Sequence, residues 1–323
     1  MIEDLRRFRV SIARLSMSVD STVGNRVLVT GATGYIGSRL VARLVSDGWE
    51  VHAVIRQGTK SLAATCLTSS VRLHEHDGST GGMIDIVAGC RPGIVYHLAS
   101  LFLSQHEADD VARLINSNVV FGAQLAEAVV AAKVPFFINT GTSWQHFKDA
   151  EYLPVNLYAA TKQAFEDILT YYIDAHGLKV ATLLLFDTYG PEDPRPKLIP
   201  LLCRAAETNQ RLQMSPGEQL IDLVHVDDVV DAFLAAAASL PTQSQGHAHY
   251  GVSSGSPVPL VELVAAFERA VGKSLHVTWG GRPYRPREVM RPWGRFNLVP
   301  NWHPRVSFEV GIRQLWRSVD MED

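Results

Sequence analysis

The sequence predicts an α/β protein built on a doubly wound parallel sheet, with a smaller mixed α/β region toward the C-terminus. Two observations favour this class. From residue 25, short apolar runs alternate with helical stretches of ten or more residues, as right-handed crossovers between parallel strands require. The glycine-rich stretch TGATGYIG at 30–37 lies directly between the first strand and the first helix, where sheets of this class bind ligands.

The strands and helices of this pattern follow one another along the chain. Apolar or β-branched runs predict strands at 26–30, 50–56, 93–99, 135–140 and 179–186. Stretches with helical spacing predict helices at 38–48, 109–132 and 157–177. Strands that alternate with such helices form a parallel sheet that is covered on both faces.

The glycine loop is the first functional signal. RVLVTGATGYIGSRL places Gly31, Gly34 and Gly37 between a strand and a helix. In such a loop the first glycine allows a tight turn, the second lets a pyrophosphate approach the backbone, and the third lets the helix pack on the strand. The helix N-terminus then faces the phosphates with free N–H groups and its positive dipole end. The loop therefore predicts a Rossmann-type dinucleotide-binding sheet.

The end of the second strand indicates which dinucleotide is bound. A carboxylate there would bind the 2′-hydroxyl of NAD, whereas a guanidinium would accept the 2′-phosphate of NADP. Arg56 ends this strand, Lys60 follows, and no acidic residue lies between them. Arg39, just past the glycine loop, could add a second contact. We expect NADP(H) rather than NAD(H).

The regular alternation stops near residue 190, where the turn-rich GPEDPRP begins. Beyond it we expect helices at 197–209 and 259–272, a strand entering a helix at 222–240, and a Pro/Arg-rich stretch at 280–295. We predict a dinucleotide-binding domain at 25–190, to which later segments such as 219–240 return, and a mainly substrate-binding region at 191–323. Residues 1–24 are expected to form an N-terminal extension, either a helical arm or a disordered segment.

Composition and charge exclude several classes of function. The 323 residues carry a formal net charge of −3, which argues against nucleic acid and anionic membranes as partners. No apolar stretch reaches the length that spans a bilayer, and the start of the chain lacks the apolar core of a secretory signal. The 3 cysteines are far apart, so we expect free thiols in a cytoplasmic protein. HEHD at 74–77 lacks a second ligand cluster, and we predict no metal site.

A second group of motifs carries the chemistry. YAATK at 158–162 places Tyr158 and Lys162 one helical turn apart, after a strand that ends in the hydroxyl-rich NTGTS at 139–143. Together with the glycine loop, this order resembles the extended short-chain dehydrogenase/reductases, and among them the nucleotide-sugar epimerase/reductase group. The similarity runs from about residue 26 to about residue 316. Its further motifs are HDG at 76–78, VYHLAS at 95–100, Asn118, DTYGPED at 187–193, DLVHVDDVVDAF at 222–233 and NWHP at 301–304.

This resemblance implies roles for individual residues. Thr142 would bind a substrate oxygen, Tyr158 would protonate a carbonyl as hydride arrives, and Lys162 would hold the nicotinamide ribose and lower the pKa of Tyr158. Asp77 resembles a residue that contacts adenine. The cofactor-binding candidates are Gly31, Thr33, Gly34, Tyr35, Ile36, Gly37, Arg56, Asp77, Gly78, Leu98, Ala99, Ser100, Thr140, Tyr158 and Lys162.

The residues after Thr142 narrow the reaction. In the related 4,6-dehydratases an Asp-Glu pair follows this threonine, whereas Ser143 and Trp144 follow it here. The 3,5-epimerase/reductases need a pocket cysteine, and 136–147 holds none. Because Arg56 favours NADPH, we expect reduction of a 4-keto group on a nucleotide-linked 6-deoxy or 3,6-dideoxy sugar. The alternatives are an NAD-dependent 4-epimerase and a catalytically idle NADP-binding sensor or scaffold.

A nucleotide-sugar substrate carries a diphosphate, which guanidinium groups bind in bidentate fashion. The substrate-binding candidates are Ser143, Trp144, Arg195, Lys197, Arg282, Arg285 and Arg287. Asp187 stands where many members of the group have an asparagine that helps to hold the diphosphate, and a carboxylate there would repel phosphate. By resemblance the helices at about 107–132 and 157–175 would pair across a two-fold axis, so we expect a homodimer.

Overall fold

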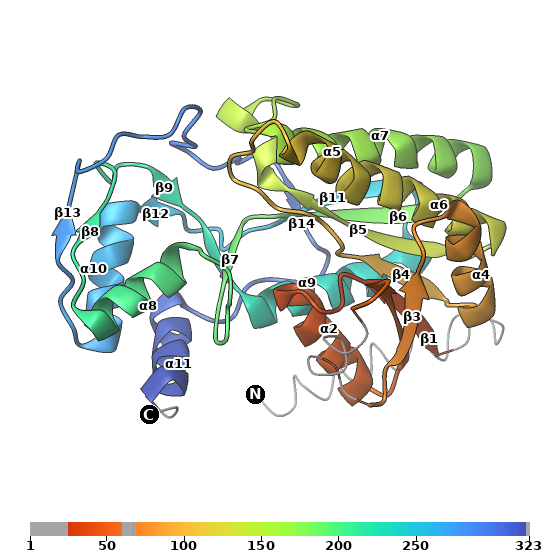
Figure 1. The fold of residues 1–323 in the computed structure, drawn as a ribbon, viewed down its shortest axis with the longest axis horizontal. Helices are drawn as coiled ribbons and strands as arrows, with labels where there is room; N and C mark the ends of the chain where they lie inside the picture. The colour runs from red at the N-terminus through yellow and green to blue at the C-terminus, as the bar shows by residue number, and fades with distance from the viewer. Residues whose placement is uncertain (1–24, 60–66, 68, 321–323) are drawn as a thin grey trace.

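The computed structural model describes residues 25–59, 67 and 69–320 (Figure 1). The predicted N-terminal extension, residues 1–24, lies outside the described residues. The described chain forms a large sheet covered by helices and, to the left in Figure 1, a smaller region.

The large sheet has eight strands in the order β14-β11-β6-β5-β4-β1-β2-β3, and neighbouring strands pair in parallel throughout. The strands are β1 (Arg26–Thr30), β2 (Glu50–Arg56), β3 (Arg72–His76), β4 (Ile94–His97), β5 (Phe136–Thr142), β6 (Lys179–Leu185), β11 (His247–Val252) and β14 (Asn297–Leu298). The predicted α/β class with a doubly wound parallel sheet is confirmed. The strand order reverses between β1 and β4, so a crevice for a ligand opens at the carboxyl ends of these two strands.

Two helical layers bury the two faces of the sheet. The helices on the first face are α2 (Tyr35–Ser46) and α9 (Val226–Ser239), whose core side chains include Leu40 and Phe233. Those on the second face are α4 (Thr80–Cys90), α5 (Asp110–Ile115), α6 (Phe121–Ala131) and α7 (Leu157–His176), whose core side chains include Met83, Leu125 and Phe165. Both faces are therefore apolar, as a parallel sheet requires.

β3, α4 and β11 were not predicted from the sequence. RLHEH in β3 carries mostly polar side chains, which the edge strand of the sheet tolerates because all its residues but His76 are partly or fully exposed. TGGMIDIVAGC in α4 contains three glycines, which are poor helix formers, yet α4 packs Met83, Val87 and Cys90 into the core. Tertiary packing therefore decides both elements.

The expected helix at 109–132 is interrupted. A π-helical turn at Asn116–Val120 separates α5 from α6 and places the side chain of Asn118 in the interior. The segment Asp110–Ala131 is also long and apolar enough to cross a membrane by length and composition, so the expectation that no stretch reaches that length was wrong. Part of its hydropathy comes from core residues such as Leu114 and Leu125, which pack in the helical layer beside α4 and α7, and part from the exposed Val111, Ile115 and Val120.

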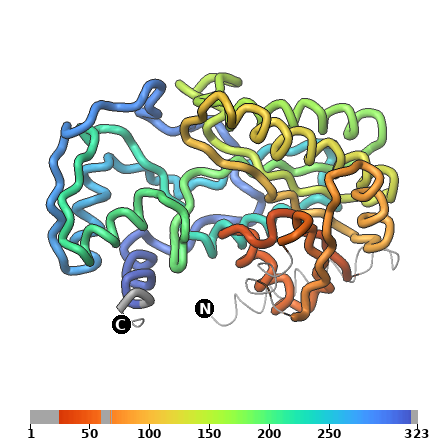
Figure 2. Tube along the Cα trace, in the orientation of Figure 1, coloured from red at the N-terminus to blue at the C-terminus, as the bar shows by residue number. Residues whose placement is uncertain are grey.

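The smaller region has its own core. Its helices are α8 (Leu198–Thr208), α10 (Leu260–Val271) and α11 (Phe308–Asp320), which pack around Leu202, Phe267 and Ile312. Short strands flank them: β7 (Asp187–Tyr189), β8 (Leu212–Gln213), β9 (Leu220–Ile221), β10 (Leu223–His225), β12 (Val258–Pro259) and β13 (Val277–Thr278). The chain enters this region after β6, returns to the sheet for α9 and β11, and returns again for β14 (Figure 2). These crossings join the two regions along one cleft.

Candidate active site

The glycine loop is pressed against the end of β4. Gly31 has a φ of +71°, and a Cβ on it would lie 2.6 Å from the backbone nitrogen of Ala99. A Cβ on Gly37 would collide with the carbonyl oxygen of Gly31. No side chain caps the N-terminus of α2 at Gly34, so its first N–H groups remain available to an anion. The loop therefore leaves backbone space and donors for a pyrophosphate.

The segment after β7 closes over this loop. The Tyr35 hydroxyl donates to the carbonyl oxygen of Pro191 at 3.2 Å, and Arg39 donates to the same oxygen at 2.5 Å. The Arg195 guanidinium lies 4.5 Å from the centre of the Tyr35 ring. Thr33 is exposed at the loop tip, whereas Ile36 packs against the core. Arg39 is therefore held at the glycine loop and not beside Arg56.

The two residues predicted to contact adenosine end neighbouring strands. Arg56, the last residue of β2, is exposed and pairs in register with His76 of β3. The Asp77 carboxylate accepts hydrogen bonds from the backbone N–H and the hydroxyl of Ser79, which lower the pKa of Asp77. Gly78 is exposed with a φ of +90°. Pairing of β2 with β3 therefore brings Arg56 and Asp77 to one edge.

The hydroxyl strand β5 ends at the crevice. The Thr140 hydroxyl donates to the His97 carbonyl oxygen at 2.8 Å, which ties β5 to β4. Thr142 is 8% exposed, and its hydroxyl oxygen accepts weakly from the Trp144 N–H at 3.3 Å. One lone pair and the hydroxyl proton of Thr142 therefore remain for a ligand.

Tyr158 stands in the first turn of α7. Asn156 caps this helix by accepting from the Ala159 N–H at 2.9 Å, and its amide donates to two carbonyl oxygens in 103–104. The Tyr158 ring meets the Phe102 ring edge-on at 5.0 Å. Burial raises the pKa of Tyr158 to about 12, although a hydrogen bond with Ser100 and the charge of Arg195 both act to lower it. The sequence predicted a pKa lowered by Lys162; instead burial dominates and the opposing cation is Arg195.

Lys162 is 1% exposed one turn further along α7. Burial lowers the pKa of Lys162 to about 8, although the Glu166 carboxylate acts in the opposite direction. Its ammonium has no hydrogen-bond partner among the described residues. A buried ammonium is stabilised by oxygen atoms placed close to it. Ribose hydroxyls of a dinucleotide fit this requirement.

The turn beneath this crevice is fixed by Asn118. Its amide donates to the Leu101 carbonyl oxygen at 3.0 Å and to the Thr161 hydroxyl at 2.9 Å. Its side-chain oxygen accepts from the Leu101 N–H at 2.7 Å and from the Ser100 hydroxyl at 3.3 Å. The π-helical turn therefore supplies a structural bracket that sets Leu98–Ser100 against α7.

A polar chain that the sequence analysis did not identify supports Thr142. The Gln145 side-chain oxygen accepts from the Thr142 N–H at 2.9 Å, and its amide donates to the Glu166 carboxylate at 2.9 Å. His249 of β11 lies 3.0 Å from the other oxygen of that carboxylate. Gln145 and Glu166 are both buried. Gln145 follows Thr142 by three residues and Glu166 follows Lys162 by four, and this spacing could have indicated from the sequence that they lie beside the site.

The substrate side is a narrow cleft of about 50 Å³ between β5 and the smaller region. Ser143, Trp144 and Arg285 line it together with Asp187 and Glu288. The Lys197 ammonium lies 3.1 Å from the Asp187 carboxylate, which removes the repulsion expected for a phosphate at this position. The structure therefore brings Ser143, Trp144 and Arg285 to one cleft, and Lys197 reaches it through Asp187.

Three predicted diphosphate ligands lie elsewhere or are already engaged. Arg195 binds the Asp193 carboxylate through two nitrogens at 2.7 Å. Arg287 donates to the carbonyl oxygens of Pro154 and Val155 and stacks on Phe147 at 4.5 Å. Arg282 is exposed on the smaller region, where its backbone N–H donates to the carbonyl oxygen of Met214. The guanidinium groups of Arg195 and Arg287 therefore have partners within the chain, and Arg282 is not among the residues that line the cleft.

Comparison with known proteins agrees with this geometry. The family model described as "NAD dependent epimerase/dehydratase family" matches residues 27–252. A CDP-abequose synthase of Salmonella typhimurium is 26% identical over 91% of this chain and 98% of its own length. A UDP-glucose 4-epimerase of Mycolicibacterium smegmatis is 29% identical over 89% of this chain and 96% of its own length. The crystal structure of UDP-glucose 4-epimerase from Thermotoga maritima with UDP-glucose superposes with a TM-score of 0.80 at 22% identity, covering 92% of this chain and 99% of that one.

The likeness spans both regions of the molecule and nearly the full length of these proteins. The predicted membership of the extended short-chain dehydrogenase/reductases, and the prediction of an NAD(P)-dependent oxidoreductase acting on nucleotide sugars, are confirmed. The glycine loop and the buried Lys162 fit the dinucleotide that gives the family its description. The chain belongs to the NAD dependent epimerase/dehydratase family.

Proposed function

We propose that the protein reduces the 4-keto group of a nucleotide-linked 6-deoxy or 3,6-dideoxy sugar with NADPH. The observation that carries this proposal is that each carboxylate lining the cleft already has a partner within the protein. Asp187 is paired with Lys197, Glu288 with Arg285, and Asp222 accepts from the Ser253 hydroxyl and the Ser254 N–H. Among the described residues no unpaired acid lines the cleft beside Thr142, so β-elimination lacks its acid and base.

Similar proteins favour the same reaction. Three CDP-abequose synthases, at 23–27% identity, match 83–91% of this chain. An abequose synthase forms a 3,6-dideoxy sugar, which is the kind of product that the plain hydride transfer at this site would yield. We therefore assign a CDP-linked 4-keto-3,6-dideoxyhexose as the first substrate to test.

The chain's own residues would act as follows. Bound NADPH would supply the hydride that reaches the carbonyl carbon. Tyr158 then donates its phenolic proton to the carbonyl oxygen, and its raised pKa keeps that proton in place at neutral pH. The Thr142 hydroxyl holds the same oxygen, and the Lys162 ammonium holds the cofactor ribose. Trp144 and Phe102, whose rings lie 5.7 Å apart, form the aromatic outer side of the site.

Arg56 supports NADPH over NADH. It is exposed at the carboxyl end of β2, where the 2′-phosphate of NADP would lie, and it makes no side-chain hydrogen bond within the described chain. The two acids at the end of the neighbouring strand have other partners: Asp77 accepts from Ser79, and Glu75 accepts from the Gly58 N–H at 3.4 Å. A guanidinium without a carboxylate beside it favours a dianionic 2′-phosphate over a hydroxyl.

We also propose a cytoplasmic homodimer. The outer sides of α5, the π-helical turn and α7 expose Val111, Ile115, Val120 and Tyr171. Apolar side chains gathered on two adjacent helices are typical of an interface. Cys90 and Cys203 are free, buried thiols, as expected in a reducing compartment. Sedimentation of the purified protein would test the dimer.

A 4-epimerase is the second candidate, because UDP-glucose 4-epimerases also match this chain over most of its length. The experiment that separates the two measures the cofactor. The purified protein should lose any bound nucleotide on dialysis and should oxidise NADPH only when the CDP-linked 4-keto sugar is added. Stoichiometric NAD retained after dialysis, with interconversion of UDP-glucose and UDP-galactose, would establish the epimerase instead. An idle scaffold would do neither.

A further inference from the structure

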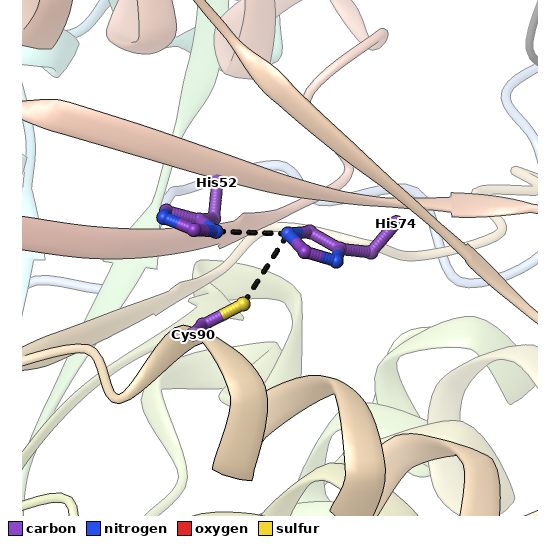
Figure 3. A group of neighbouring side chains, drawn as sticks. All are labelled: His52, His74 and Cys90. Carbon is purple, nitrogen blue, oxygen red and sulfur yellow. Dashed lines mark hydrogen bonds between the residues drawn. The ribbon is translucent and has the colours of Figure 1, made fainter.

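A cluster of three metal-ligating side chains lies away from the active site, at the opposite half of strands β2 and β3. His52 comes from β2, His74 from β3 and Cys90 from the last residue of α4 (Figure 3). One ligand atom of each lies within 4.8 Å of the others. His52 and Cys90 are buried, and His74 is half-buried. The strand pairing that the sequence did not reveal therefore supplies the second group of ligands that HEHD at 74–77 lacked.

The register of the sheet explains the convergence. β2 and β3 pair in parallel with Val54 opposite His74, so His52 and His74 lie two positions apart on the same face. That face is covered by α4, whose C-terminal residue is Cys90. The Nδ1 atom of His52 lies 2.8 Å from the Nε2 atom of His74, and the Cys90 sulfur lies 3.3 Å from that same Nε2 atom.

Hydrogen bonds set the proton positions of the metal-free cluster. The Glu50 carboxylate lies 3.2 Å from His52 Nε2, which places the imidazole proton on Nε2 and leaves a lone pair on Nδ1. The Nε2 atom of His74 then donates to His52 Nδ1. Transfer of the His74 proton to its own Nδ1 atom, and release of the Cys90 thiol proton to solvent, would leave two imidazole lone pairs and one thiolate for an ion.

We propose that His52, His74 and Cys90 bind a zinc ion that joins β2, β3 and α4. Imidazole and thiolate are the ligands that zinc prefers, and three protein ligands leave a fourth position for water. In tetrahedral zinc, ligand atoms lie about 3.3–3.6 Å apart, so these side chains need to separate by only a few tenths of an ångström. The half-buried His74 gives the ion a path from solvent.

The surroundings of the cluster fit this assignment. Glu50 on His52 is the carboxylate–histidine contact that orients metal-bound imidazoles. Two guanidiniums border the cluster, but Arg72 binds the Glu50 carboxylate at 3.1 Å and Arg26 donates to the Cys90 carbonyl oxygen at 2.9 Å. The ligand atoms of the cluster are imidazole nitrogens and a sulfur, which suit Zn²⁺ and not hard ions such as Mg²⁺ or Ca²⁺ that bind through oxygen.

The position also indicates what the ion does. β3 is the edge strand of the sheet, and it carries the predicted adenosine contact Asp77 directly after its last residue. An ion at His52 and His74 would hold this edge strand and α4 onto β2. We therefore expect a structural role that is independent of the reaction.

The experiment uses the full chain, stripped of metal, with Co²⁺ as the probe. One equivalent of Co²⁺ should produce the visible bands of a tetrahedral ion and a thiolate-to-cobalt charge-transfer band, and Zn²⁺ should remove both by displacement. Cys90→Ser should abolish the charge-transfer band, whereas Cys203→Ser, in the smaller region, should keep it. Glu50→Gln should keep the band and weaken binding about tenfold. Zn²⁺ in hundredfold excess over its dissociation constant should raise the Tm by several degrees in wild type and not in Cys90→Ser.

Several outcomes overturn the proposal. They are the absence of the charge-transfer band or its survival in Cys90→Ser. Loss of the band in Cys66→Ser would also overturn it, because the thiolate would then come from Cys66, which lies outside the described residues. If Cys90→Ser does not fold, X-ray absorption on zinc-loaded wild type decides. One sulfur at about 2.3 Å with two imidazole nitrogens at about 2.0–2.1 Å supports the site, and a shell without sulfur refutes it.

Discussion

Replacing Lys162 with methionine should stabilise the cofactor-free protein while it weakens cofactor binding. The Lys162 side chain is 1% exposed, and its ammonium has no hydrogen-bond partner among the described residues. Burial lowers its pKa from 10.5 to about 8. Because each pKa unit corresponds to about 1.4 kcal/mol, burial disfavours the charged form by about 3 kcal/mol. Methionine fills similar space without a charge, so Lys162→Met should raise the free energy of unfolding by up to that amount.

The lowered pKa of Lys162 determines how the stability difference between Lys162→Met and wild type changes with pH. Below pH 8 both the native and the unfolded chain carry the Lys162 proton, and the native state bears the full burial penalty. Between pH 8 and about 10.5 the unfolded chain binds more protons at this residue than the native chain, so the stability of wild type rises with pH. The advantage of Lys162→Met over wild type should therefore be largest at pH 7 and should fade toward pH 10.5. Other groups titrate equally in both proteins and cancel in the difference.

Thermal unfolding of the two apo proteins across this pH range is the assay. A matched control is Lys179→Met, because the Lys179 ammonium donates to the Gln243 carbonyl oxygen at 3.2 Å and its removal should not stabilise the protein. Added NADP⁺ should raise the Tm of wild type and raise that of Lys162→Met much less. A Lys162→Met variant that is less stable than wild type at pH 7 would refute the reasoning, since it would mean that the ammonium has a stabilising partner.

Three further substitutions test the proposed site. Tyr158→Phe should lower kcat by roughly 10²–10⁴ while NADP⁺ affinity stays within a few-fold, as measured by turnover and fluorescence titration; activity near that of wild type would remove Tyr158 as the proton donor. Arg56→Asp should lower the preference for NADPH over NADH by tenfold or more in kcat/KM, and an unchanged ratio would show that Arg56 does not touch the 2′-phosphate. Gln145→Leu leaves the Thr142 N–H and one Glu166 oxygen without a partner, so kcat should fall by about 10-fold to 100-fold with little change in KM. Gln163→Leu is its control, because it removes a partly buried contact to Gln145 and an exposed one to Asp167 but leaves the contacts of Thr142 and Glu166 intact.

Local sequence was sufficient for the cofactor loop and for the pair on α7. Gly31, Gly34 and Gly37 act within one strand–turn–helix unit, and Tyr158 and Lys162 act one helical turn apart, so their geometry follows from short-range rules. The alternation of strands and helices likewise predicted the parallel sheet. The same local pattern did not reveal β3, because an edge strand with polar side chains becomes recognisable only when β2 pairs with it.

Tertiary structure decided the partners of the charged side chains. The sequence could count arginines in 280–295, but only the fold shows that Arg287 caps carbonyls beside Val155 and that Arg285 faces the cleft. From the sequence Asp187 was expected to repel phosphate. The fold shows that its carboxylate is neutralised by Lys197, ten residues away. Long flexible side chains have many possible partners at similar sequence distance, and packing selects among them.

The sequence by itself determined the fold class, the dinucleotide loop and the Tyr158–Lys162 pair, because each depends on residues within a few positions of one another. Only the tertiary structure decided which distant residues meet, such as Gln145 with Glu166 and His52 with His74 and Cys90. Those contacts depend on strand register and helix packing, which bring together residues that no short-range pattern connects.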